Sequence, residues 1–505
     1  MRMYKQQLLA LAALCSVMAA TNVLGADQAQ FGQRFSRNMV SDESNLPVSF
    51  DPETGENLRW SAPLGTETNS TPVIAGGRVL IGTNNEQPRD PRHTGRRGVL
   101  LCLDEKTGKL CWQLVVPRFE DKKILDWQTG GICSPVLVEG ERVYVVTNRA
   151  EVMCLDLQGQ ANGNDGPYQD EARHMTPAGD TPIEVTAKDA DILWVYDMCA
   201  ELEVQPHDAP YGSVLAYGDH LYVNTGNGID RTHHFVPSPD APSLIVLDKK
   251  TGCLLAQDGE KIGPNIFHCT WSSPSMGEVR GEPRIFFCGG DAVCYAFKPL
   301  GSGRSSNSVQ TLERVWRFDC DPTAPKENVQ QYIRNREQSP SVIMGMPVFY
   351  QNRIYLTGGG DIWWGKREAW VQCIDATQRG DVTQSAQIWS YPVGKHCTST
   401  PAIHDGLVFV GDFGRQIHCL DADTGRAHWV QKTRGTMFSS ALVADGKGYV
   451  GTQRRELWVF AADKEKQVLA TMELDSPIIA TPVAASGTLY IATMKKLYAA
   501  SRAAR

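Results

Sequence analysis

Three features that would assign a function directly are missing from this chain of 505 residues. No segment after Ala20 is apolar over the roughly 20 residues that a membrane-spanning helix needs, so no transmembrane segment is expected in the mature protein. The formal net charge of −7 argues against a general nucleic-acid-binding protein, which needs a basic surface. The 14 cysteines include no CxxC pair and no Cys/His zinc spacing.

The N-terminus has the pattern of a secretory signal peptide. Arg2 and Lys5 precede an apolar run from Leu8 to Ala20, and small residues follow as far as Ala26. We expect residues 1–26 to be a signal peptide and residues 27–47 to be an N-terminal extension. The pattern predicts an exported protein, soluble in the periplasm or outside the cell.

A degenerate repeat fills most of the chain. Its clearest copy, Thr398–Trp429, contains four short apolar strands separated by turns that are rich in Gly and Asp. Four strands in about 40 residues is the period of a propeller blade. Seven further copies begin at Ser70, Cys133, Gly212, Ser272, Gly345, Ser439 and Ala480.

The last copy and the N-terminus complete each other. The copy that begins at Ala480 ends after three strands, whereas Phe50–Trp60 has a blade's last turn and outer strand without preceding inner strands. A ring joined by these two segments covers both sheet edges. The sequence therefore predicts an all-β fold: an eight-bladed β-propeller over residues 48–501, closed by an N-terminal outer strand that completes the last, C-terminal blade.

Residues that recur at fixed repeat positions are assigned to the scaffold. In Asp421, Gly425 and Trp429, for example, the Asp folds back on its own turn, the Gly permits a positive φ, and the Trp packs between blades. The sequence allows disulfides among the cysteines that do not recur in the repeat and does not say which of them pair. Five cysteines recur just before the turn and are predicted to be buried free thiols: Cys102, Cys154, Cys294, Cys373 and Cys419.

Most long insertions fall on one face of the predicted ring. Within a blade the connections alternate between faces, so the loop leading into a blade shares a face with the loop joining its second and third strands. Loops on a rigid scaffold usually carry the binding residues. The insertion at 158–191 is expected on the opposite face. The face defined here as the long-loop rim carries the insertions at 84–98, 118–131, 199–210, 226–243, 257–271, 320–344 and 358–370.

The long-loop rim is rich in aromatic rings, histidines and cations. Arg and Trp together suit an anionic or planar aromatic ligand, although the same residues also serve simply to pack loop against loop. His233 and His234 alone do not predict a metal site, because adjacent side chains point apart and no third ligand is identifiable. The expected ligand-binding residues are Arg97, Asn227, Arg231, His233, His234, His268, Trp271, Trp363 and Trp364.

The repeated phrase, with its SxP inner strand, LD-x-x-TG turn and outer Trp, resembles the pyrroloquinoline quinone (PQQ) repeat over nearly the whole mature chain. This resemblance implies an eight-bladed propeller and one of two functions. Quinoprotein alcohol dehydrogenases of the periplasm hold the quinone and a calcium ion over the channel. Outer-membrane assembly propellers bind proteins and carry no cofactor.

Two segments resemble the dehydrogenase branch more closely. Asn224–Gly228 is similar to a GTGN segment whose Asn is a calcium ligand, which implies Asn227 as a metal ligand. Residues 268–272 resemble an H-D-x-W-D stretch that brings the catalytic acid. Cys269 and Ser272 stand where this stretch has carboxylates, so the resemblance does not supply the base that alcohol oxidation needs.

These observations favour a binding or scaffold protein that takes a protein or small-molecule ligand on its long-loop rim, without an assigned catalytic residue. The alternative is a quinoprotein alcohol dehydrogenase-like oxidoreductase with an altered active site. Its cofactors would be PQQ and calcium, and Asp208, Asp361 or another rim acid would replace the lost base. A third hypothesis is a carbohydrate- or polymer-binding protein that uses the exposed Trp residues, since aromatic faces stack on sugars.

Overall fold

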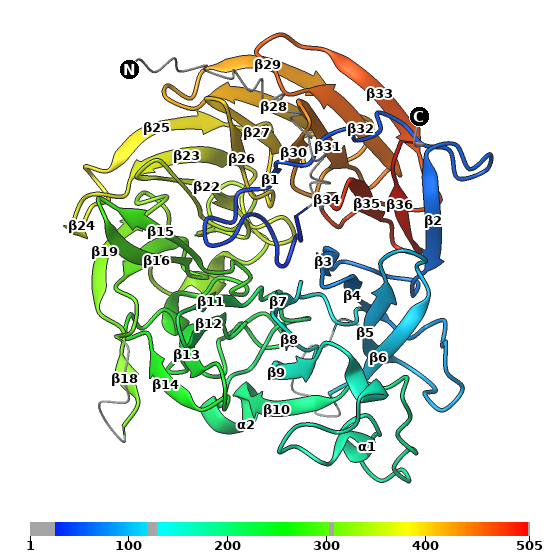
Figure 1. Cartoon of the computed structure of the whole chain (residues 1–505). Helices are drawn as coiled ribbons and strands as arrows, with labels where there is room; N and C mark the ends of the chain where they lie inside the picture. The colour runs from blue at the N-terminus through cyan, green and yellow to red at the C-terminus, as the bar shows by residue number, and fades with distance from the viewer. Residues whose placement is uncertain (1–25, 120–126, 128, 302–307, 503–505) are drawn as a thin grey trace, which may run out of the picture.

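The computed structural model describes residues 26–119, 127, 129–301 and 308–502. Within these residues eight sheets surround a central axis, and the helices are short turns between strands (Figure 1). The predicted all-β, eight-bladed propeller is confirmed. The expected signal peptide lies outside the described residues except for Ala26, and the described helices include none that is long and apolar enough to span a membrane.

Each blade is an antiparallel sheet that the sequence repeat encodes directly. In the clearest copy, the second strand is apolar throughout and fully buried, because both of its faces pack against neighbouring blades. Asp405 and Gly406 form the turn before it with φ of 47° and 74°, the positive values that a two-residue hairpin requires. The strands of this sixth blade are β26 (Ala402–His404), β27 (Leu407–Gly411), β28 (Gln416–Asp421) and β29 (Ala427–Lys432).

The other blades follow the same order from the centre outward. Blade 1 contains β3 (Val73–Ala75), β4 (Arg78–Asn84), β5 (Arg97–Asp104) and β6 (Leu110–Pro117), and blade 2 contains β7 (Leu137–Glu139), β8 (Arg142–Val146), β9 (Glu151–Asp156) and β10 (Ile192–Asp197). Blade 3 contains β11 (Leu215–Tyr217), β12 (His220–Asn224), β13 (Leu244–Asp248) and β14 (Leu254–Gln257), and blade 4 contains β15 (Ser275–Val279), β16 (Glu282–Cys288), β17 (Val293–Phe297) and β19 (Arg314–Asp319). Blade 5 contains β21 (Val348–Tyr350), β22 (Arg353–Gly360), β23 (Ala369–Asp375) and β25 (Gln387–Pro392), and blade 7 contains β30 (Leu442–Ala444), β31 (Lys447–Gly451), β32 (Glu456–Ala461) and β33 (Val468–Glu473).

The ring closes as the sequence predicts. Blade 8 contains β34 (Val483–Ala485), β35 (Thr488–Ala492) and β36 (Lys496–Ala500), and its outer strand is β2 (Leu58–Pro63) from the N-terminus. β2 pairs antiparallel with β36, and Trp60 lies opposite Ala499. Figure 1 shows blue β2 beside red β36. Each end of the chain therefore supplies part of one sheet.

The recurring Gly and Trp residues hold neighbouring blades together. Gly425 has a φ of 71°, and a Cβ at this position would lie 2.6 Å from the ring of Trp389 in the preceding blade. Gly108 stands in the same relation to Trp60 across the point of ring closure. Because the turn glycine has no Cβ, the tryptophan ring of the preceding blade can pack directly against the turn, in agreement with the scaffold role expected from the sequence.

Residues 27–47, defined here as the N-terminal segment, cross the centre of the ring (Figure 1). The segment contacts the turns between first and second strands of blades 1, 7 and 8, which lie on the face opposite the long-loop rim. Backbone hydrogen bonds join this segment to the inner strands of blades 1, 2, 4, 5 and 7, and β1 (Val40–Ser41) pairs in parallel with β30. The Asn38 side-chain amide donates a hydrogen bond to the Ile403 carbonyl of blade 6, and the Ser41 hydroxyl donates to the Ala484 carbonyl of blade 8. The segment therefore covers this end of the channel.

Arg37 fixes the centre of the N-terminal segment. Its guanidinium is fully buried and donates to the carbonyl oxygens of Phe31, Ser213, Val214 and Pro274, at 2.9–3.3 Å, and to Ser213 Oγ at 3.0 Å. Burial lowers the pKa of Arg37 to about 9, which still leaves the side chain charged at neutral pH. One cation thus ties the segment to blades 3 and 4.

Insertions between third and fourth strands pair with the preceding blade. β18 (Gln310–Thr311) runs parallel to β14, and β24 (Gly380–Asp381) runs parallel to β19. The insertion 158–191, which contains α1 (Glu171–His174), also bridges β6 through Asp189 and reaches Arg92 on the long-loop rim. This insertion therefore follows the outer edge and is not confined to the opposite face. The remaining short elements are α2 (Met198–Leu202), β20 (Ser341–Val342) and 3-10 turns at Gly159–Ala161, Gly263–Asn265 and Val329–Tyr332.

All thirteen cysteines in the described part of the chain are free thiols. The five that recur in the repeat are fully buried, as the pattern predicts. None of the disulfides that the sequence allowed is present among these residues. Of the thirteen thiols, that of Cys253 is exposed.

Candidate functional site

A cavity of about 390 Å³, here called the channel pocket, lies at the centre of the ring on the side of the long-loop rim. Residues from the incoming loops or inner strands of all eight blades line it, and Phe31 of the N-terminal segment contributes from the opposite side. Its aromatic wall consists of Trp127, Tyr211, Trp271 and Trp363. The described lining residues include one carboxylate, Asp208, and neither Lys nor Arg. The pocket is therefore apolar and aromatic, with hydroxyl groups between the rings.

Five of the residues predicted for the site gather beside this pocket. The ring centroid of His268 lies 5.0 Å from Trp271 and 5.5 Å from Trp363, and that of His233 lies 4.4 Å from Trp364. They come from three loops, which lead into blade 4 and join the second and third strands of blades 3 and 5. The long-loop rim thus brings together residues that are more than 100 positions apart in the sequence.

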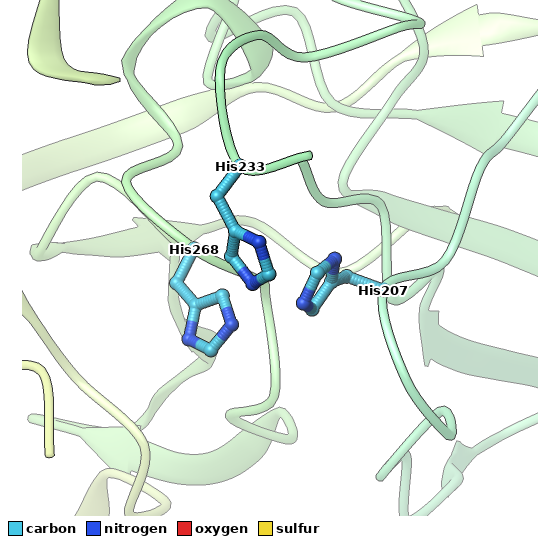
Figure 2. A group of neighbouring side chains, drawn as sticks. All are labelled: His207, His233 and His268. Atoms are coloured by element: carbon cyan, nitrogen blue, oxygen red, sulfur yellow. The ribbon is translucent and has the colours of Figure 1, made fainter. Parts of the chain in front are cut away.

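A third histidine, which the sequence analysis missed, completes the group. His207 lies in the loop between α2 and β11, with its ring centroid 4.7 Å from His233 and 4.6 Å from His268. Figure 2 shows the three rings converging from separate strands of backbone. Their ligand-capable nitrogen atoms all lie within 4.8 Å of one another. We call these residues the histidine cluster.

Burial favours the neutral imidazole in two members of the histidine cluster, His207 and His233. His207 and His268 are 1% and 2% exposed, and His233 is half-buried. Burial, aided by the nearby His268, lowers the pKa of His207 to about 3. Burial also lowers the pKa of His233. Neutral imidazole is the form that donates a lone pair to a metal ion.

Asp361 is a positioning residue for His268. Its Oδ2 lies 2.8 Å from His268 Nδ1, and its Oδ1 accepts hydrogen bonds from the backbone amides of Trp363 and Trp364. Burial by itself raises the pKa of Asp361, but His268 and the two amides lower it below its ordinary value. The carboxylate is fully buried and committed to these partners, so it does not face the channel pocket as a free base.

Asn227 lies on the same loop as His233, and its side-chain amide is hydrogen-bonded to other protein groups. Its Oδ1 accepts from the Gln205 amide at 3.2 Å, and its Nδ2 donates to the Ser238 carbonyl at 2.8 Å. The side chain is fully buried. The structure therefore places Asn227 as a support for the loops rather than as an open ligand position.

The other predicted residues lie outside the histidine cluster. Arg231 and His234 are exposed on the same loop as His233. Arg97 lies at the start of β5, where burial lowers its pKa and Asp180 of the 158–191 insertion is nearby. In the same loop, Arg92 pairs with Asp189 at 3.0 Å. Arg89 and Arg96 of this loop do not face the insertion, since Arg89 donates to the Pro63 carbonyl and Arg96 pairs with Glu86. None of these arginines is among the described lining residues of the channel pocket.

Comparisons with known proteins agree with this architecture. The family model described as outer membrane protein assembly factor BamB matches residues 96–305 and 367–504, which is more than half of the chain. A search of curated proteins finds no match.

Solved structures with the same fold include both branches of PQQ-repeat propellers. BamB from Moraxella catarrhalis is 12% identical, with a TM-score of 0.53 over 88% of this chain and 99% of that one. A europium-containing methanol dehydrogenase is 13% identical, with a TM-score of 0.56 over 94% and 89% of the two chains. The quinohemoprotein alcohol dehydrogenase from Comamonas testosteroni is 12% identical, with a TM-score of 0.57 over 95% and 81%. At these identities the likeness establishes the fold alone, and the match of the family model establishes that this chain belongs to the PQQ-repeat family described as outer membrane protein assembly factor BamB.

Proposed function

We propose that this protein is a binding protein without a catalytic role, and that its long-loop rim holds a segment of a partner protein with an apolar side chain in the channel pocket. The single observation that carries the proposal is the aromatic pocket at the centre of the rim, whose described lining contains no Lys or Arg. A pocket of this kind suits an apolar anchor.

Exposed aromatic side chains on the long-loop rim support this interpretation. Phe235 is 56% exposed and Trp363 is 38% exposed, and both belong to loops of the long-loop rim. Large apolar side chains exposed around a pocket are typical of protein-interaction sites. Membership of an assembly-factor family favours a protein partner over a small molecule.

Site-specific photo-cross-linking tests the proposal in cells that produce the protein. A photoreactive phenylalanine analogue at Phe235 is expected to give a discrete cross-linked product. The matched control is the analogue at Val468, which is 41% exposed on β33 at the outer edge of blade 7. Filling the pocket with Met346→Trp should abolish the product at Phe235. A product of equal yield from Val468, or one that survives Met346→Trp in a folded variant, contradicts the proposal.

The residues present do not fit the calcium–quinone pair of the dehydrogenases. The amide of Asn227 is satisfied by protein groups, and Cys269 and Ser272 are buried where carboxylates would be needed. Burial raises the pKa of the Cys269 thiol far above neutral pH, so this residue does not serve as a base. PQQ also carries carboxylates, whereas the described lining of the channel pocket offers no Lys or Arg to receive them.

A direct cofactor test separates the two functions. The purified full chain is mixed with PQQ and Ca²⁺, desalted, and examined for quinone absorbance and for dye reduction with an alcohol. The binding-protein proposal predicts no retained quinone and no dye reduction. Retention of one quinone per chain, lost in Trp271→Ala, would support the dehydrogenase alternative instead.

A further inference from the structure

The histidine cluster contains two buried nitrogen atoms that have no hydrogen-bond partner among the residues that the structure describes. These atoms are Nε2 of His207 and Nε2 of His268. Both side chains are nearly inaccessible to water, so solvent does not compensate for the missing partner. Burying an unsatisfied polar atom costs free energy, and such atoms in a native structure call for a specific explanation.

The tautomer of His207 follows from its other ring nitrogen. Its Nδ1 lies 2.9 Å from the Ile229 carbonyl oxygen, which only accepts hydrogen bonds. The proton of the neutral ring must therefore be on Nδ1, and the lone pair of Nε2 is left without a hydrogen-bond partner. In His268 the Asp361 carboxylate likewise accepts a hydrogen bond from Nδ1 at 2.8 Å, so Nε2 is the nitrogen that is free to bind a metal ion. Both rings thus present a bare Nε2 to the interior of the cluster.

His233 closes the cluster from a third loop. It has a φ of 64°, and its backbone amide donates to the Asp230 carbonyl at 3.0 Å, so a tight turn sets the direction of its side chain. The ring is also hydrogen-bonded to the backbone of Arg231. One ring nitrogen remains to face His207 and His268, as Figure 2 shows.

We propose that His207, His233 and His268 together bind a divalent transition-metal ion of the zinc type. Imidazole nitrogen suits such ions. A hydrogen bond from the second ring nitrogen to a carboxylate or a carbonyl is the arrangement that orients metal-binding histidines. All three rings have such a partner: Asp361 for His268, and backbone groups at Ile229 and Arg231 for the other two. The metal would take up the lone pairs that the protein leaves unpaired.

Three protein ligands leave a coordination position for a further donor. Asp208 Oδ2 lies 3.9 Å from His207 Nε2, so its carboxylate or a water molecule can occupy this position. Trp271 and Trp363 each contact the ring of His268 and also line the channel pocket. The metal site therefore lies in the wall of the pocket. Its ligands come from loops of blades 3 and 4, and Asp361 of blade 5 orients His268. This inference does not depend on the identity of a partner protein.

Metal binding is tested on the full chain prepared without a histidine tag and stripped with a chelator. Titration with Zn²⁺ is expected to show one tightly bound equivalent. His207→Gln and His268→Gln should each abolish tight binding, whereas His234→Gln, the exposed neighbour of His233, should leave the affinity unchanged. Asp361→Asn should weaken the affinity about 10- to 100-fold, the effect of losing a carboxylate that orients a ligand.

Co²⁺ provides a readout that does not depend on comparing variants. Three imidazole ligands predict visible d–d absorption bands without a thiolate-to-cobalt charge-transfer band, although Cys269 lies close by. Circular dichroism of the stripped variants shows whether they are folded. The proposal is overturned if the wild-type chain binds no stoichiometric Zn²⁺, if folded His207→Gln binds it equally well, or if the Co²⁺ spectrum requires a sulfur ligand.

Discussion

The buried Arg37 should control whether the N-terminal segment stays seated across the channel. Arg37→Met keeps most of the apolar stem of the side chain but removes the guanidinium. Four backbone carbonyl groups and the Ser213 hydroxyl lose their shared donor as a result. The blades themselves keep their strand pairing, so the expected change is local opening of the segment rather than collapse of the propeller.

The size of the effect follows from the burial of this network. Removing one member of a buried, charged hydrogen-bonded group costs about 3–5 kcal/mol. Since each 1.4 kcal/mol is a factor of ten, the population of the open segment should rise roughly 100- to 4000-fold. Arg34→Met is the matched control, because this exposed side chain makes a 3.5 Å ion pair with Glu139 that contributes at most about 1 kcal/mol.

Hydrogen exchange followed by mass spectrometry measures this opening directly. The amide of Met276 donates to the Phe35 carbonyl at 2.7 Å, and that of Val138 donates to the Ala29 carbonyl at 2.8 Å. Both amides should lose protection in Arg37→Met and keep it in Arg34→Met. Unchanged protection in Arg37→Met, or an equal loss in the control, would refute the assignment of Arg37 as the anchor of the segment.

Two further predictions concern the scaffold. Gly425→Ala should destabilise the protein by about 2–4 kcal/mol in chemical denaturation, because its φ is positive and the new Cβ would meet Trp389. Gly406→Ala, with a similar φ and open space around it, should cost only about 1–2 kcal/mol, and equal losses would contradict the packing role of the turn glycine. Burial raises the pKa of Asp191 to about 6, above the ordinary value of 3.8, so its protonated form is favoured in the folded state. Stability from this group is complete below pH 4 and is lost as the pH rises through 6, and Asp191→Asn should reduce this loss in urea unfolding curves measured across that range.

Most of the fold is predictable because the sequence consists of repeats. The two-residue turns, the buried second strands and the Gly–Trp contacts recur, so each copy confirms the others, and the incomplete copy at Ala480 points to its missing strand at Trp60. The N-terminal segment follows no such pattern. It binds each blade through different backbone groups and one buried arginine, and these contacts exist only after the ring has formed.

The candidate site was predictable to the extent that loop length identifies the long-loop rim. His233, His268 and Trp271 come together because long insertions lie on one rim. His207 was missed because it is a lone histidine in an incoming loop, without a motif or a spacing that relates it to His233. Its position depends on the bridge between Pro206 and Asn227, a long-range contact that no local pattern encodes. A search for every histidine in the rim insertions would have included it.

The most direct test of the histidine site, and of the ring that builds it, is anomalous diffraction from crystals grown with Zn²⁺ on both sides of the zinc absorption edge. We predict one strong peak among His207, His233 and His268, with zinc–nitrogen distances of about 2.0–2.1 Å, in the wall of the channel pocket. Crystals that diffract well and show no peak among these rings, or show zinc only at other residues such as Cys253, would contradict the account.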